Sequence, residues 1–150
     1  MAYHRGRTFI PPMNQMRALA VLLLATSIGF GASSCGRVKE DKMAAGLYNA
    51  TKGYRESIRW GYFDAAVGFL YPDTRADLDA KLLENVRVTG YEVIQPAVIT
   101  PQETAVQLVR IEYVLEDQQR LKSLMDRQDW RWDADSAGWW LHSGMPKFED

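Results

Sequence analysis

The chain has 150 residues, of which 47% are hydrophobic and 25% charged, and its formal net charge is −1. This length is typical of one domain, and a near-neutral charge without a basic cluster excludes the electrostatic footprint of a nucleic-acid-binding protein. The single cysteine excludes an intramolecular disulfide framework.

Residues 1–34 have the pattern of a secretory signal peptide. Three arginines precede an apolar run over residues 18–28, and no acidic residue occurs before Cys35. Glycines and serines interrupt the run before the roughly 20 apolar residues that a membrane-spanning helix needs. The basic residues are Arg5, Arg7 and Arg17, and three translation starts remain open: Met1, Met13 and Met16.

The segment Ala32-Ser33-Ser34-Cys35 places small residues directly before the single cysteine and resembles the bacterial lipobox. The resemblance implies that residues 1–34 are removed and that acylated Cys35 anchors the mature chain in a lipid bilayer. The alternative is an ordinary thiol beside an ordinary cleavage site. In enteric bacteria, Asp directly after the lipidated cysteine retains a lipoprotein at the inner membrane. Gly36 occupies this position here, which implies that the protein is located at the periplasmic face of the outer membrane. The mature chain has 15 basic and 19 acidic residues, a net charge of −4.

After a polar tether over residues 35–39, we expect a single domain over residues 40–150. Helical spacing predicts a first amphipathic helix from about Glu40 to Trp60, with an inner face formed by Met43, Leu47, Ala50, Tyr54 and Ile58. A short second helix follows Gly61 and ends at Pro72, with apolar residues Phe63, Ala66, Val67 and Leu70. Asp73 can cap a third helix that runs to about Asn85 and carries Leu78, Leu82 and Leu83.

Four strands are expected in the second half of the chain, where β-branched and aromatic residues predominate. Their ranges are Val86–Ile99, Thr104–Leu115, Arg120–Trp132 and Gly138–Ser143. Short polar turns between them predict antiparallel neighbours. In the second strand, one face holds Ala105, Gln107, Val109, Ile111, Tyr113 and Leu115. Gly90 and Pro96 indicate a bulge or an edge position in the first.

Helices followed by antiparallel strands predict an α+β fold, with three helices packed on one face of a four-stranded sheet. This order, the Trp60-to-Ala66 segment and the terminal Gly138-Trp139-Trp140-Leu141 strand resemble the nuclear transport factor-like superfamily over residues 40–148. The resemblance implies a curved sheet that forms a cone, whose open end can hold a small apolar ligand. An alternative is the fold of small outer-membrane assembly lipoproteins.

The same superfamily includes ketosteroid isomerase, SnoaL-like cyclases and non-catalytic binding domains, so the fold does not decide the function. Its enzymes use an Asp or His base, for which His142 and Asp64 are the candidates. A packing or surface role for His142, and a favourable position of Asp64 at a helix start, are the competing interpretations. If the cone is open, its aromatic wall would be Tyr62, Tyr91, Tyr113 and Trp130; otherwise these residues fill the core.

Two further patterns concern partners and metals. Trp139 and Trp140 are adjacent in a strand and must point to opposite faces, so Trp140 is a candidate for an interface in a homodimer or with another envelope protein. Asp133, Asp135 and Gly138 partly fit the start of a calcium loop, but position five is Ala137 and position twelve is Gly144. A polar hairpin turn is the better interpretation, and we expect neither metal nor cofactor.

The leading hypothesis is therefore a non-enzymatic envelope lipoprotein that binds a small apolar ligand or serves as an accessory subunit. The alternative is an isomerase-like or cyclase-like enzyme.

Overall fold

The computed structural model describes residues 33–75 and 83–148. The chain divides into two units, residues 1–39 and 40–150, and every described core residue lies in the second. Two α-helices, α2 (Ser33–Arg59) and α3 (Phe63–Val67), and a 3-10 helix, η1 (Pro72–Arg75), come first among the described elements. The strands are β1 (Val86–Ile99), β2 (Thr104–Leu115), β3 (Arg120–Asp133) and β4 (Gly138–Leu141).

Helix α2 begins at Ser33, seven residues before the expected start, so residues 36–39 of the expected tether are helical. It ends within one residue of the expected position. Gly61 has a φ of +71°, and backbone N–H groups of Gly61 and Tyr62 donate to the carbonyls of Ile58 and Ser57. This is a Schellman motif, in which a glycine adopts the left-handed conformation that other residues avoid.

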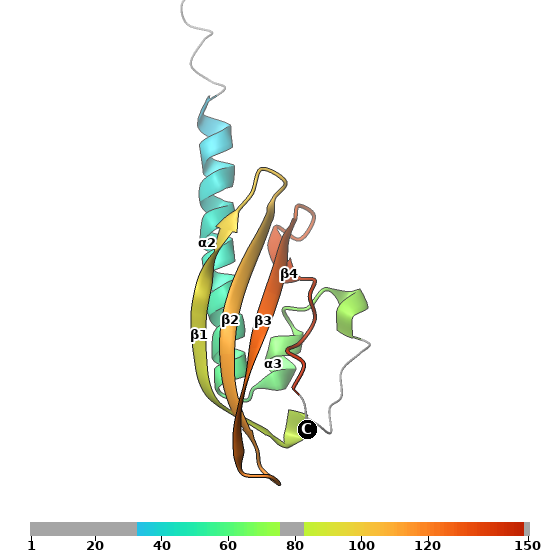
Figure 1. Cartoon of the computed structure of the whole chain (residues 1–150). Helices are drawn as coiled ribbons and strands as arrows, with labels where there is room; N and C mark the ends of the chain where they lie inside the picture. The colour runs from blue at the N-terminus through green and yellow to red at the C-terminus, as the bar shows by residue number, and fades with distance from the viewer. Residues whose placement is uncertain (1–32, 76–82, 149–150) are drawn as a thin grey trace, which may run out of the picture. The chain divides into compact units, whose positions relative to one another are not determined.

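The four strands form one antiparallel sheet in the order β1-β2-β3-β4, and they lie side by side in Figure 1. The bounds of β1 and β2 agree with the sequence prediction, β3 is one residue longer and β4 two residues shorter. The expected irregularity in β1 is also confirmed, because its pairing with β2 shifts register near Gly90 and on both sides of Gln95.

The hydrophobic core lies between α2 and the inner face of the sheet. Tyr54 packs edge-to-face against Trp130, with ring centroids 5.7 Å apart, and the indole N–H of Trp139 donates to the Met43 carbonyl at 2.9 Å. The predicted inner faces of α2 and β2 are confirmed. The buried hydrophobic residues on these faces are Met43, Leu47, Tyr54, Ile58, Ala105, Val109, Ile111, Tyr113 and Leu115, and Ala50 is half-buried against them.

The second predicted helix is present as α3, and a parallel bridge pairs Leu70 with Leu141 of β4. The prediction of a third helix from Asp73 to Asn85 was wrong at its start, which lies in the 3-10 helix η1. Most of its remaining length, including Leu78 and Leu82, lies outside the described residues, whereas Leu83 and Glu84, near its expected end, are helical. Within residues 33–75 and 83–148 the fold is α+β, with one long helix on a four-stranded antiparallel sheet.

Candidate functional site

A groove of about 590 Å³ lies between α2 and the second half of β1. This volume falls within the range of about 300–1,000 Å³ that is typical of small-molecule sites. The register shifts on both sides of Gln95 interrupt regular pairing in this part of β1. The lining residues are Ala44, Leu47, Tyr48, Thr51, Lys52, Arg55, Val93, Pro96, Ala97, Val98, Ile99 and Gln107.

Large apolar side chains are exposed along the groove. Tyr48 is 65% exposed and Val98 69% exposed, and Val93 is also open to solvent. Such side chains are ordinary when they are scattered, but a cluster of them beside a concave surface marks a binding site. The hydroxyl of Thr51 donates to the Leu47 carbonyl at 2.9 Å, so the helix backbone already satisfies this polar group.

A polar cluster on the inner face of the sheet adjoins the groove at Gln107. The Gln107 amide donates to the Gln128 side-chain oxygen at 3.2 Å. The Gln128 amide in turn donates to the Tyr91 hydroxyl at 2.9 Å and to an Asp126 carboxylate oxygen at 2.8 Å. Three strands therefore contribute to one connected hydrogen-bond network, and Gln107 belongs both to the network and to the groove lining.

Burial changes the acidity of this cluster. Desolvation raises the pKa of the Tyr91 hydroxyl to about 12, against an opposing hydrogen bond from Gln128. It also raises the pKa of the Asp126 carboxyl, which the Gln128 hydrogen bond partly offsets. Both effects arise because a low-dielectric environment disfavours the charged form. The cluster can fix polar groups in place, and it contains no Ser, Cys or Lys nucleophile.

Sequence reasoning placed Gln107 on the inner face but missed its partners. Asp126, Gln128 and Trp130 alternate along β3 and therefore share one face. Pairing of Gln107 with Gln128 and of Val109 with Asp126 puts that face on the inner side of the sheet. The alternation was visible in the sequence, but only the register with β2 shows that these polar side chains face the core.

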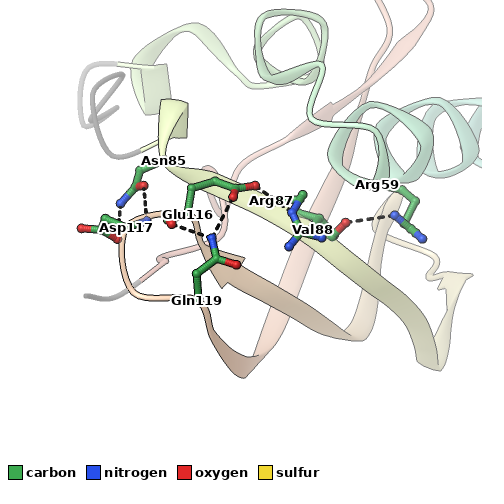
Figure 2. Close-up of polar contacts among 7 residues, drawn as sticks. All are labelled: Arg59, Asn85, Arg87, Val88, Glu116, Asp117 and Gln119. Atoms are coloured by element: carbon green, nitrogen blue, oxygen red, sulfur yellow. Dashed lines mark hydrogen bonds and ion pairs between the residues drawn. The ribbon is translucent and has the colours of Figure 1, made fainter.

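A second cavity, of about 580 Å³, lies where β1 begins. Arg59 of α2 donates to the Val88 carbonyl at 2.9 Å, and Arg87 forms a 2.7 Å ion pair with Glu116. The hydrogen bond from Arg87 lowers the pKa of the Glu116 carboxyl. Figure 2 shows these contacts together with those of Asn85, Asp117 and Gln119. Arg87 and Glu116 thus pair with each other, and the hydrogen bond from Arg59 to the Val88 carbonyl joins α2 to β1.

The two candidate bases occupy different settings. The imidazole of His142 stacks on the Tyr71 ring with centroids 4.3 Å apart, and desolvation lowers its pKa. Asp64 is exposed in the first turn of α3, where it lines a cavity of about 370 Å³. Neither residue belongs to the groove or to the polar cluster.

The four aromatic residues expected to line a pocket do not form one wall. Trp130 is fully buried and Tyr113 nearly so, whereas Tyr62 is 65% exposed. Tyr91 is half-buried and joins the polar cluster. Trp130 and Tyr113 therefore fill the core.

Trp139 and Trp140 point to opposite faces, as expected. Trp139 is buried against α2, while Trp140 is half-buried on the outer side. The Trp140 indole donates to the Ser136 hydroxyl at 3.2 Å, and the Arg75 guanidinium lies 5.9 Å from its ring centroid. Residues of the same chain thus cover part of the candidate interface residue.

The Asp133–Ala137 segment is a hydrogen-bonded turn. Asp133 accepts hydrogen bonds from the backbone of Asp135 and from the hydroxyl of Ser136, and the latter bond lowers the pKa of the Asp133 carboxyl. Among residues 33–75 and 83–148, no three His, Cys, Asp or Glu side chains are grouped so as to hold a metal ion.

Cys35 lies in the first turn of α2, and residues 1–32 of the expected signal peptide lie outside the described residues. In the part of the chain that the structure describes, no helix combines the length and apolarity required to span a membrane. Lipidation of Cys35 stays a prediction.

Comparisons with protein-family models, curated proteins and solved structures found no match.

Proposed function

We propose that this chain is a lipid-anchored protein of the bacterial cell envelope whose folded domain binds a small apolar molecule. The anchor is supported by the signal pattern and by the small residues before Cys35. Two or more acyl chains suffice for stable membrane attachment, so the folded domain need not insert into the bilayer.

The observation that carries the binding function is the groove between α2 and β1. Eight of its lining residues are Ala, Leu, Val, Ile, Pro or Tyr, and several of them are exposed to solvent. Burial of such surface by a ligand is favourable, at about 25 cal/mol per Å² of apolar area. An apolar wall with a few polar groups is the usual composition of a small-molecule site.

The binding test uses residues 36–150, because every described core residue lies between Met43 and Phe148. The neutral dye N-phenyl-1-naphthylamine becomes fluorescent in apolar sites and serves as the probe. Ala44 lines the groove, so Ala44→Trp should fill part of it and abolish most of the dye signal. Ala45 is the next residue on the same helix and does not line the groove, so Ala45→Trp is the matched control.

Loss of dye binding in Ala44→Trp with retention in Ala45→Trp would support the proposal. Equal binding by both variants, or no saturable binding by the unmodified fragment, would show that the groove is not a ligand site. Circular dichroism of both variants establishes that each is folded.

The anchor is tested on the full chain expressed in a bacterium. Mass spectrometry of the purified protein should give the mass of residues 35–150 plus a diacylglyceryl group and an amide-linked acyl chain. A mature chain that begins elsewhere, or one without lipid on Cys35, would contradict the anchor without affecting the binding test.

A further inference from the structure

We infer that the ligand of the α2–β1 groove is an anionic amphiphile, with an aliphatic chain along the groove and an acidic head group beside Lys52 and Arg55. This inference rests on the proposed binding function and adds the chemical class of the ligand.

The charges that line the groove are all of one sign. Among the residues that the structure describes, Lys52 and Arg55 are the two charged residues in its lining, and no Asp or Glu contributes to it. Both side chains are exposed, and neither forms a salt bridge within residues 33–75 and 83–148. Two cations without a carboxylate partner beside an apolar surface complement a ligand that is negative at one end and apolar over the rest.

The arrangement on α2 separates the two parts of this ligand. Residues three or four apart share a helix face, so Lys52 and Arg55 lie together in successive turns. Tyr48 and Ala44 continue the same face toward the N-terminal end of α2 and carry no charge. At a rise of 1.5 Å per residue, the stripe from Ala44 to Lys52 extends about 12 Å along the helix. An acidic head at the cationic end would therefore place its chain against Tyr48 and the apolar residues of β1.

One of the two cations also borders a second cavity. Arg55 lines a smaller neighbouring cavity together with Glu56, Arg59, Trp60 and Tyr91, but among the described residues no salt bridge joins Arg55 to Glu56. Gln107, the polar residue on the sheet side of the groove, donates its amide to Gln128. Positive charge, rather than a neutral hydrogen-bonding group, is thus the polar feature that the groove offers a ligand.

The test compares dodecanoate with dodecanol, which share the same chain and differ in the head group. The affinity of each ligand is measured by its displacement of N-phenyl-1-naphthylamine from the fragment of residues 36–150 at neutral pH. Dodecanoate should bind about three- to tenfold more tightly, as expected for two solvent-exposed ion pairs. Raising the salt concentration should reduce this preference, because exposed charges are screened.

The double variant Lys52→Gln/Arg55→Gln should remove the preference and leave dodecanol affinity unchanged. Lys42→Gln is the matched control, since Lys42 is exposed on the same helix and does not line the groove. The inference is overturned if the unmodified fragment binds both ligands equally, or if the preference survives the double variant. In either case, dye binding that remains sensitive to Ala44→Trp would leave the binding function intact.

Discussion

Replacement of Gln128 by glutamate tests whether the polar cluster is held together as the structure describes. Gln128 is fully buried, and its amide donates to both Tyr91 and Asp126. Gln128→Glu preserves the shape of the side chain but replaces the donating amide with a carboxylate. The new carboxylate would face Asp126 at the position of the present 2.8 Å hydrogen bond.

Two carboxylates this close cannot both remain charged, so the folded protein should take up a proton that the two share. The unfolded chain ionises both groups at pH 7, with a glutamate pKa of about 4.3. At 1.36 kcal/mol per pH unit, uptake of this proton lowers the free energy of unfolding by about 3.7 kcal/mol at pH 7. Because the folded state of the variant holds the extra proton, its free energy of unfolding falls as pH rises. The decrease relative to the unmodified protein should therefore be only about 1 kcal/mol at pH 5.

Urea unfolding monitored by tryptophan fluorescence provides the measurement, because Trp130 is fully buried in the core. The difference in unfolding free energy between variant and unmodified protein is determined at pH 5, 6 and 7. Gln102→Glu is the control, since Gln102 is exposed in the turn between β1 and β2 and the charge change is the same. A destabilisation that is the same at pH 5 and pH 7, or absent at pH 7, would refute the proposed pairing of Gln128 with Asp126.

Two further predictions concern packing against α2. An added Cβ at Gly53 would lie 2.8 Å from the ring of Phe69. Gly53→Ala should therefore lower the free energy of unfolding by up to about 2 kcal/mol, despite a gain of about 1 kcal/mol in helix propensity. A higher melting temperature of the variant would contradict this contact. Within the described part of the chain, the Met145 sulfur, at 3.8 Å, is the one hydrogen-bond partner of the buried Tyr54 hydroxyl. Because a thioether is a weak acceptor, Tyr54→Phe should lower the unfolding free energy by less than about 1 kcal/mol. Denaturant titration measures this change, and a larger loss would indicate a stronger partner.

Local sequence patterns predicted the strands and their turns well. Alternation in β2 identified its buried face, and the polar segments between strands coincide with the observed turns. The helical spacing from Met43 to Ile58 likewise identified the face of α2 that packs on the sheet. These features depend on residues close together in the chain, and burial of one face stabilises the same periodicity that the sequence displays.

The start of α2 was less predictable because helical periodicity is weak in its polar first turns. Residues 36–40 are exposed, so no buried face marks where the helix begins. A helix that is polar all round can be read equally well as a tether. The structure places the helix start at Ser33.

The sequence by itself determined the α+β class, the four strands and the inner faces of α2 and β2, since each follows from local spacing. Only the tertiary structure decided that Trp130 and Tyr113 fill the core, because burial depends on what α2 and the other strands place against them. It also brought Gln107, Gln128, Asp126 and Tyr91 together through strand register. The groove has the same origin, since its two walls are α2 and β1, which are far apart in the chain.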